Sequence, residues 1–380
     1  MEPSGRDETR AELEALLALA FTPGLGVLRA RRLLEEHGSG RAVVRAVERK
    51  GGEKGPLGAL LSRAVRERVR RTRAAAAEAG MGILGWGLPG YPQRLLPLAD
   101  APLALFHKGD PAILQGKAAV ALVGTRTPTP YGREAAERLA AGLASRGVVV
   151  VSGLARGVDS HAHKAALQAG GPTAAVLAGG LDRIYPPERV SMAEEIARRG
   201  ILLSEMPPGK GPVPGLFPRR NRILSGVSDL VVVVEAARRS GALITAQWAL
   251  DQGRDVAAVP GSIFSPVSKG PFLLLRDGAA PVDSAESILE LLPAFSDPVK
   301  KVEQGKKEKK KEEEEEEAKD RKGLSPAEQA FLDALDRAGG DPEEAARLAG
   351  IPVDQALALG VSLEMKGRAR SRGQGLLFPT

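Results

Sequence analysis

Three arginines fall within four residues, shortly before a run of four valines. Residues 217–222 read Phe-Pro-Arg-Arg-Asn-Arg, and the valines occupy 231–234. Guanidinium groups donate paired hydrogen bonds whose geometry suits phosphate oxygens. The spacing therefore predicts a binding site for a phosphate-containing polyanion.

Two further loops carry arginine in a similar setting. Gly124-Thr125-Arg126 follows the apolar stretch 118–123, and Ser152 to Gly157, with Arg156, follows 148–151. Ligands of open α/β sheets bind beyond the carboxyl ends of the strands, so we expect these loops to meet. They supply hydroxyl donors, arginine charges, an amide, and glycines that permit close backbone approach. The expected site residues are Gly124, Thr125, Arg126, Ser152, Gly153, Arg156, Gly157, Phe217, Arg219, Arg220, Asn221 and Arg222.

The elements that must position these loops alternate between strand and helix. Short apolar runs predict strands at 118–123, 148–151, 173–178, 201–204, 231–234 and 256–259. Between them we expect helices at 131–145, at a segment ending near Gly170, and at 191–199, 217–226, 242–252 and 271–276. Continuous β-branched runs alternating with helices are typical of a parallel sheet covered on both faces. The prediction is an α/β fold with a Rossmann-like, doubly wound parallel sheet.

The flanking segments differ in composition. Residues 1–80 are Arg-rich and helical in pattern, and Thr22 to Ala30 resembles a helix-hairpin-helix turn that could approach a phosphate or simply pack. Residues 81–116 read as a Gly/Pro-rich connector, and 300–322 is a Lys/Glu linker without core-forming residues. A helix capped by Ser325, two further helices at 345–348 and 351–365, and a basic wing at 366–373 suggest a C-terminal winged helix. We expect four parts: 1–80, 81–295 (the Rossmann-like domain), 296–323 and 324–380.

Composition excludes several classes of function. The 380 residues contain no cysteine, which removes disulfides, thiol catalysis and cysteine-ligated zinc and suits a reducing cytoplasm. No run of about 18 apolar residues predicts a membrane span, and the N-terminus lacks a signal pattern. The net charge of +7 is compatible with nucleic acid. Aromatic residues make up only 3%, so extended base stacking is not expected to be the main device.

The site lacks the marks of a dinucleotide enzyme or of a hydrolase. A dinucleotide fold carries Gly-x-Gly-x-x-Gly after its first strand, whereas this chain has Arg126 at the second glycine's place. No nucleophile and base are evident, and His161 and His163 lie two apart on a helix, facing different sides. Glu205 and Glu235 are the best acid candidates, but they could equally orient the arginines. We therefore expect no enzyme, no metal and no cofactor.

Six ordered motifs resemble the DNA-processing protein A (DprA/Smf) family. They cover the chain firmly from about 81 to 292, while the helix-hairpin-helix and winged-helix segments resemble appendages of that family. The motifs occupy 123–126, 152–159, 180–186, 217–223, 240–246 and 259–262.

The resemblance implies a binding protein. Members of that family bind and protect single-stranded DNA during natural transformation, help to load the RecA recombinase onto it, and form homodimers through their Rossmann domains. Carried onto this sequence, the strand would be held by Arg126, the Ser152-Gly153 turn, Arg156 and residues 219–221. Phe217 is the nearest aromatic side chain for a base contact.

Two alternatives stay open on sequence alone. One is a nucleotide-processing enzyme of the phosphoribohydrolase (lysine-decarboxylase-like) type, although 177–182 lacks the expected Pro-Gly-Gly-x-Gly-Thr loop. The other is a duplex-binding regulator built around 324–380. For the favoured function we expect Arg126→Glu or Arg220→Glu to abolish single-strand binding and leave the fold intact.

Overall fold

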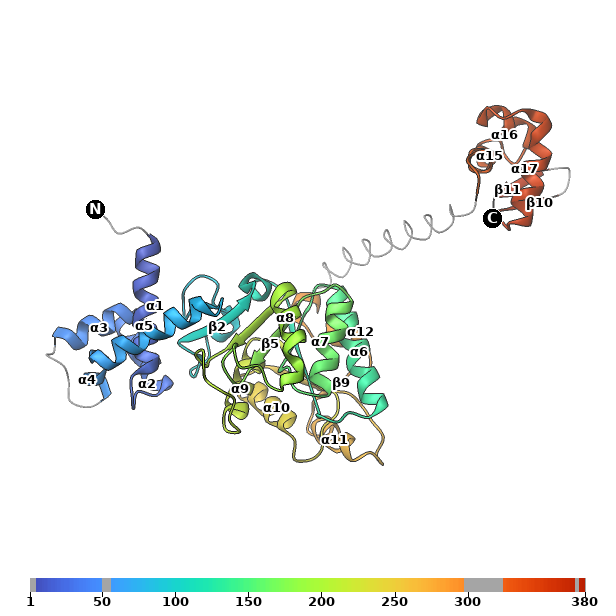
Figure 1. Cartoon of the computed structure of the whole chain (residues 1–380). Coiled ribbons are helices and arrows are strands. Elements are labelled where there is room, and N and C mark those ends of the chain that lie inside the picture. Colours follow the sequence, from blue (N-terminus) through green and yellow to red (C-terminus); the bar gives the residue numbers. More distant parts are fainter. Residues whose placement is uncertain (1–4, 50–55, 297–323, 373–375, 380) are drawn as a thin grey trace. The chain divides into compact units, whose positions relative to one another are not determined.

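The computed structural model of this chain describes residues 5–49, 56–296, 324–372 and 376–379. Two compact units divide the chain, Met1–Ser296 with the sheet and Asp297–Thr380 with the C-terminal helices (Figure 1). The predicted Lys/Glu linker at 300–322 lies outside the described residues. Each unit is described by itself, and the expected four-part division of the chain stays a prediction.

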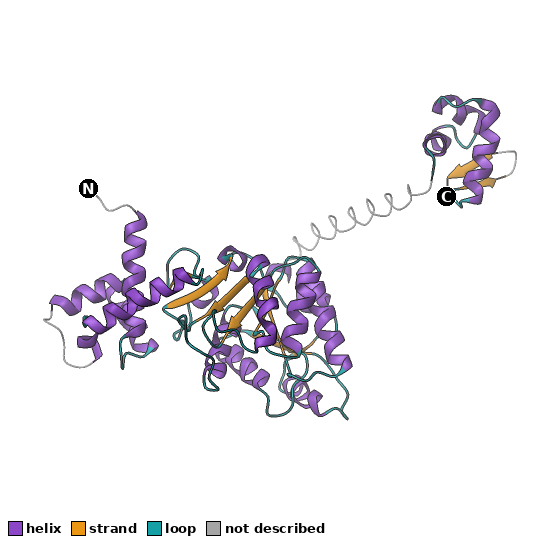
Figure 2. Cartoon of the chain, viewed as in Figure 1, coloured by secondary structure: helices purple, strands orange, loops and turns teal. Residues whose placement is uncertain are grey.

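Within the described residues, the first unit contains one nine-stranded sheet, ordered β1-β2-β6-β5-β4-β3-β7-β8-β9. Figure 2 shows strands of this sheet in orange among purple helices. Neighbouring strands from β6 to β9 pair in parallel, as predicted. The strands are β1 (Gly82–Gly85), β2 (Ala104–Gly109), β3 (Ala119–Val123), β4 (Val149–Ser152), β5 (Thr173–Leu177), β6 (Ile201–Ser204), β7 (Leu230–Val233), β8 (Asp255–Ala258) and β9 (Ala280–Pro281). The α/β, Rossmann-like fold class is thereby confirmed.

Helices cover both faces of the sheet because successive strand residues point to opposite sides. Val120 and Val150 face the core beneath α6, α7 and α12, whereas Ala121 and Val151 face the core beneath α9 and α10. The helices of this region are α6 (Pro130–Ser145), α7 (Val158–Gln168), α8 (Val190–Arg199), α9 (Leu216–Gly226), α10 (Gly241–Asp251), α11 (Lys269–Arg276), α12 (Ala285–Glu290) and α13 (Pro293–Ser296).

Local sequence signals set where these helices begin. Thr129 caps α6, since its Oγ1 accepts a hydrogen bond from Gly132 N at 3.1 Å, and Pro130 occupies the first helical position, as predicted. Ser240 caps α10 in the same manner, accepting from Ala242 N. Both caps follow the ends of strands, and they fix the points where the loops beyond β3 and β7 turn into helices.

One edge of the sheet corrects the sequence-based prediction. Residues 81–116 were expected to form a connector, but they contain β1 and β2, which pair with each other and, through β2, with β6 in antiparallel fashion. Their apolar residues stand in short runs, Ile83-Leu84 and Ala104-Leu105-Phe106, and do not alternate with polar residues, so no alternating pattern marks the strands. Phe106, for example, is paired with Ser204 of β6, a partner that lies far away in the sequence.

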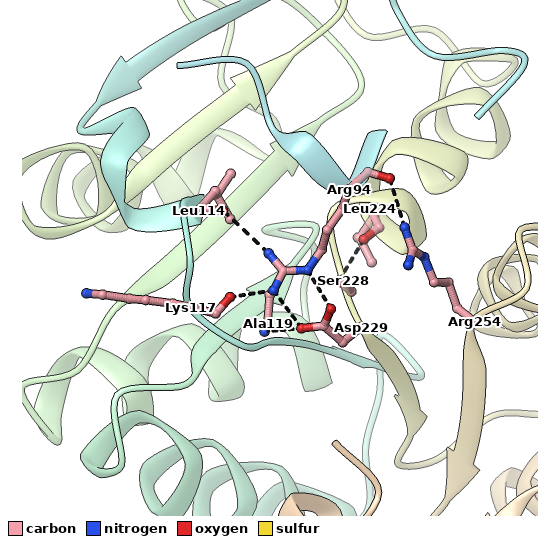
Figure 3. A network of polar contacts seen from close by, with 8 residues as sticks. All are labelled: Arg94, Leu114, Lys117, Ala119, Leu224, Ser228, Asp229 and Arg254. Carbon is pink, nitrogen blue, oxygen red and sulfur yellow. Dashed lines mark hydrogen bonds and ion pairs between the residues drawn. The ribbon is translucent and has the colours of Figure 1, made fainter. Parts of the chain in front are cut away.

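An ion pair joins the connector to the amino ends of two central strands (Figure 3). Arg94 donates from Nε to Asp229 Oδ1 at 2.6 Å, and Asp229 Oδ2 accepts from Ala119 N at 2.9 Å. Arg254 donates to the Arg94 carbonyl at 2.8 Å. Ala119 begins β3 and Asp229 precedes β7, so this network lies at the end of the sheet opposite to the arginine loops.

The N-terminal helices pack into a small core of their own. They are α1 (Gly5–Phe21), α2 (Val27–His37), α3 (Gly40–Arg49), α4 (Pro56–Leu60) and α5 (Arg63–Glu78). Leu16, Leu34 and Val43 are buried there together. The turn between α1 and α2 contains Gly24 at φ +74°, a conformation that favours glycine. A glycine-containing turn therefore joins α1 to α2, while the helix-hairpin-helix assignment and its phosphate contact stay predictions.

In its described residues, the second unit has three helices followed by a two-stranded antiparallel sheet, the element order of a winged helix. The elements are α15 (Pro326–Arg337), α16 (Pro342–Ala349), α17 (Val353–Met365), β10 (Ala369–Arg372) and β11 (Leu376–Pro379). Ser325 caps α15, as predicted. Among described residues, no single helix is long and apolar enough to cross a membrane. Only α16 and α17 taken together reach that length and apolarity, and the chain bends by 108° between them.

A carboxylate in α15 ties this second unit together. The buried Glu328 accepts hydrogen bonds from Lys366 Nζ at 2.8 Å and from Ser325 N at 2.7 Å, and Ser362 Oγ also donates to it. These hydrogen bonds, that of Lys366 first, lower the pKa of Glu328 to about 2. The carboxylate is therefore charged across the physiological range, and it joins α15 to the end of α17.

Candidate functional site

A cleft opens at the carboxyl ends of β3, β4 and β7. Its volume is about 350 Å³, and it is lined by the loops that follow these strands together with α9 and the start of α10. The chain runs from β3 outward to β4, β5 and β6, then returns to place β7 on the other side of β3. The cleft thus lies at a topological switch point, where open α/β sheets bind their ligands.

The first loop is held from below by Glu235, which is buried at the end of β7. Its carbonyl oxygen accepts from Thr125 N at 2.6 Å, and its carboxylate accepts from Thr129 N at 2.9 Å and Thr129 Oγ1 at 2.5 Å. Gly124 lies so close that a Cβ atom there would come within 2.5 Å of Val158. The loop is fixed at both ends, and Arg126 extends from it, exposed, beside the cleft.

The second loop makes a constrained turn after β4. Leu154 has φ +56°, the one non-glycine residue with positive φ among the described residues. The Asp159 carboxylate accepts hydrogen bonds from the backbone N–H groups of the two residues that flank Leu154, Gly153 at 3.1 Å and Ala155 at 3.4 Å. Gly157 has φ +78°, and a Cβ atom there would meet the Thr125 carbonyl at 2.3 Å. Close packing of the two loops therefore requires glycine at this position.

Arg220 lies beneath the cleft and is not an exposed charge. Its side chain is buried, donating to the Gly153 carbonyl at 2.9 Å and to the Val176 carbonyl, with Asn221 Oδ1 3.2 Å from its Nε. Burial lowers the pKa of Arg220, with nearby Asp159 opposing the effect. Burial likewise raises the pKa of Asp159, opposed first by Arg220. The pair forms a rigid polar floor, so Arg220→Glu is now expected to disrupt the fold, contrary to the sequence-based prediction.

Three of the remaining arginines are occupied by acids. Arg222 is buried and lies 2.6 Å from Glu205 and 3.5 Å from Asp100, and Arg219 lies 3.8 Å from Glu205. Arg156 is exposed and contacts Glu188 at 2.5 Å, a hydrogen bond that raises the pKa of Arg156. Glu205 therefore orients arginines, one of the two roles considered for it.

A second, smaller hollow of about 50 Å³ adjoins the cleft and contains the site's aromatic side chains. The rings of Tyr185 and Phe217 meet edge to face with centroids 6.1 Å apart. The Arg126 guanidinium lies 5.7 Å from the Phe217 ring centre, within the range of a cation–π contact. Tyr185 is 52% exposed, so an aromatic surface is available beside a cation.

The structure brings together most, but not all, of the predicted site. Gly124, Thr125, Arg126, Phe217, Arg220 and Asn221 line the cleft, and Gly153 and Arg156 line the smaller hollow. Gly157 supports the loops from within. Ser152, Arg219 and Arg222 line neither cavity, and Ser152 is fully buried, donating to the Leu122 carbonyl at 2.7 Å. Ser152 and Arg222 thus support the site rather than face it.

Three further residues, Arg239, Ser240 and Tyr185, were not singled out as site residues from the sequence. Arg239 and the capping residue Ser240 line the cleft in the loop after β7, the same strand-end position that identified the other loops. Arg239 is exposed and has no ion-pair partner in the described part of the chain. Tyr185 lies in one of the six motifs, but nothing in that motif's spacing places it beside Phe217. Arg239 could have been predicted from its position after a strand, whereas the position of Tyr185 beside Phe217 is seen only in the folded structure.

The histidines offer no metal centre. His161 Nδ1 lies 2.7 Å from Glu137, whereas His163 is buried with Nδ1 2.7 Å from Thr173 Oγ1. Burial lowers the pKa of His163 to about 3, so it is neutral. Within the described ranges, no group of three or more acidic or histidine side chains could hold a metal ion. The site instead presents cations and aromatic rings.

The family model for DNA recombination-mediator protein A matches residues 83–293 of this chain. The match spans the sheet and every loop of the cleft. The chain belongs to the DNA recombination-mediator protein A family. The DNA processing protein DprA of Bacillus subtilis is 44% identical over 226 residues, which cover 60% of this chain and 76% of that relative.

Other relatives support the same assignment. Protein Smf of Escherichia coli is 47% identical over 53% of this chain, and the match spans about half of that relative's length, 54%. The crystal structure of DNA processing protein A from Streptococcus pneumoniae covers 73% of this chain and 98% of its own, with 34% identity and a TM-score of 0.63. The Helicobacter pylori protein, whose structure describes its single-stranded DNA binding mode, covers 55% of this chain and 93% of its own, with 32% identity and a TM-score of 0.50.

Proposed function

We propose that this protein binds single-stranded DNA in the strand-end cleft and acts as a recombination mediator. The observation that carries the proposal is the presence of unpaired arginines and aromatic rings together at the cleft. Arg126 lies beside the ring of Phe217, Tyr185 lines the adjoining hollow, and Arg239 lines the same cleft as Arg126. Neither arginine has an ion-pair partner among the described residues. Arginines bind backbone phosphates, and aromatic rings bind bases of any sequence.

The size of the cleft favours a single strand over a duplex. A hollow of about 350 Å³ accepts a phosphate with an unstacked nucleotide, whereas a stiff duplex cannot bend into it. The rigid floor of Arg220 and Asp159 keeps the loops in place before the strand arrives, which limits the ordering cost of binding. The single-strand binding mode described for the H. pylori relative supports this preference.

We further propose the partners that the family resemblance implies. The protein would protect single strands in the cytoplasm during natural transformation, help to load RecA onto them, and act as a homodimer through the Rossmann-like domain. A dimer would place two clefts on one strand, and the second contact would then be nearly intramolecular. These roles involve no bond-making step, so the proposed protein is a binding protein and not an enzyme.

The decisive experiment is a salt titration with the full chain. Fluorescence anisotropy with a labelled oligo-dT strand and with a duplex of equal length should show tighter binding to the single strand at every salt concentration. Binding should weaken steadily with salt, because each neutralised phosphate of a single strand contributes a slope of about −0.7. Equal or tighter binding to the duplex would contradict the proposed cleft.

Two further measurements test the alternative functions, duplex binding and nucleotide hydrolysis. A variant lacking 297–380 should retain most single-strand affinity; complete loss would favour a duplex-binding or C-terminal function. Release of free base from nucleoside monophosphates would favour the phosphoribohydrolase alternative, which no observation at this site supports. For the finer role, faster RecA assembly on strands coated with single-strand-binding protein is the expected result, and unchanged assembly would remove that role while leaving strand binding intact.

A further inference from the structure

A second large cavity lies away from the cleft, among the N-terminal helices. It is a groove of about 750 Å³ lined by residues of α1 and α5 and by Ile83 of β1, the edge strand of the sheet. Figure 1 shows α1 and α5 side by side. None of the lining residues belongs to the strand-end loops, so the groove is separate from the cleft proposed to hold the strand.

The floor of the groove is apolar. Val69 and Met81 are buried at its base, and Leu13, Ala18 and Ile83 are partly buried against the same core. Ala77 of α5 is exposed at the margin. Apolar surface therefore remains accessible along the groove, and a ligand with apolar side chains would gain free energy by covering it.

The walls of the groove carry arginines. Arg66, Arg70 and Arg73 follow one another on α5 at spacings of four and three residues, which places them along one face of the helix. Arg10 of α1 faces them, and the one acid among the lining residues, Glu14, accepts hydrogen bonds from both Arg10 and Arg73. Four cations and one anion leave a strongly positive rim.

Two of the four arginines, Arg66 and Arg70, retain binding capacity. Arg66 is exposed and has no acidic partner in the described ranges. The side chain of Arg70 is 78% exposed, and it pairs only with Glu67 of its own helix. Surface pairs of this kind contribute little, so a ligand carboxylate could replace Glu67 at small cost.

We propose that this groove is a docking site for an acidic, amphipathic segment of a partner protein. Its carboxylates would bind the arginines of the rim, and its apolar side chains would cover the floor, the arrangement by which helical segments occupy hydrophobic grooves. Nucleic acid fits less well, since no aromatic ring lines the groove to stack a base and a sugar–phosphate backbone would leave the apolar floor uncovered. The positive rim requires an acidic ligand, and the apolar floor favours a peptide over a nucleic acid.

The test uses the full chain and a synthetic probe. The probe is a fluorescein-labelled 16-residue peptide with leucines at helical spacing and aspartate or glutamate elsewhere. Two control peptides replace either the leucines by serine or the acids by lysine. Arg66→Glu combined with Arg70→Glu should weaken probe binding at least tenfold, whereas the matched double reversal Arg29→Glu with Arg32→Glu, on α2 and outside the groove, should change it less than twofold.

A second variant tests the floor and leaves the charge of the rim unchanged. Ala77→Gln keeps a good helix former on α5 and places an uncharged polar group at the margin of the apolar floor, so it should weaken probe binding about threefold or more. Circular dichroism and thermal unfolding confirm that each variant is folded. If the Arg66/Arg70 variant were unfolded, Ala77→Gln alone would decide.

Several outcomes would overturn the proposal. Equal losses in the groove and α2 variants would show a bulk charge effect, and undiminished binding of the serine peptide would show that the floor is unused. Loss of DNA affinity with intact peptide binding in the Arg66/Arg70 variant would assign the groove to nucleic acid instead. Arg126→Ala should leave peptide binding unchanged, which separates this proposal from that of the cleft.

Discussion

Arg126→Ala removes the most accessible cation of the cleft with little structural consequence. The guanidinium is exposed, lines both hollows, and has no acidic partner among the described residues. The loop beneath it is fixed by hydrogen bonds between Glu235 and the backbone of Thr125 and Thr129. Truncating the side chain at Cβ changes none of these, so the folded structure and its thermal stability should be preserved.

The size of the effect follows from a single phosphate contact. A hydrogen bond to a charged group contributes about 1.5–3 kcal/mol, and exposure at the cleft mouth places Arg126 at or below the lower end. A loss of about 1.4 kcal/mol corresponds to a tenfold weaker affinity. The salt slope should become shallower by about 0.7. A tenfold defect at 50 mM salt would therefore shrink to roughly fourfold at 200 mM.

The assay is fluorescence anisotropy with a labelled oligo-dT strand across that range of salt. Arg138→Ala is the matched control, because Arg138 is an exposed arginine on α6, paired only with Glu134 and outside the cleft. It should leave both affinity and slope unchanged. Equal effects of the two substitutions, or an Arg126 variant with the affinity and slope of the original chain, would refute the argument that the cleft holds the strand.

Three further expectations separate structural from binding residues. Arg220→Ala removes the donor to the buried Gly153 and Val176 carbonyls and the cation that opposes the desolvation of Asp159, so we expect a loss of about 2–4 kcal/mol in the free energy of unfolding, measured by denaturant titration; an unchanged midpoint would contradict this structural role of Arg220. Asp229→Ala breaks the network at the opposite end of the sheet, lowering stability by about 2–4 kcal/mol without altering single-strand affinity at temperatures where the protein is folded. The folded pKa of Glu328, about 2, lies below that of an unfolded glutamate, so its stabilisation of the C-terminal unit is complete above that unfolded value and lost as pH falls toward 2. Glu328→Gln should remove this dependence in thermal melts of the C-terminal unit, and an identical pH profile would count against it.

The sequence predicted the central sheet because its signals are local. Runs such as 118–123 and 231–234 are apolar throughout, as expected for strands buried on both faces, and Thr129-Pro130 marks a helix start within two residues. The strand-end argument then located the cleft without knowledge of side-chain contacts. The parts of the fold that were predicted correctly are those whose determinants are neighbours in the chain.

The parts that were missed depend on distant partners. Strands β1 and β2 acquire their identity by pairing with each other and with β6, and Ala104 to Gly109 carries no alternation that would predict this. The sequence predicts that Arg222 binds phosphate, because its acidic neighbours Glu205 and Asp100 are brought to it only by folding. Local sequence cannot tell an arginine that meets a buried carboxylate from one that meets solvent.

This distinction changes what the cleft should do in solution. Counting the arginines of the three predicted loops suggests three or four phosphate contacts in each protomer, but Arg220 and Arg222 are already committed to buried partners. Arg126 and Arg239 are the two cleft-lining cations without acidic partners among the described residues. At about −0.7 per contact, two contacts predict a slope near −1.4 per protomer, whereas four predict about −2.8. A slope near the larger value would mean that Arg156 and Arg219 leave Glu188 and Glu205 when a strand binds, since those exposed pairs are weak enough to exchange.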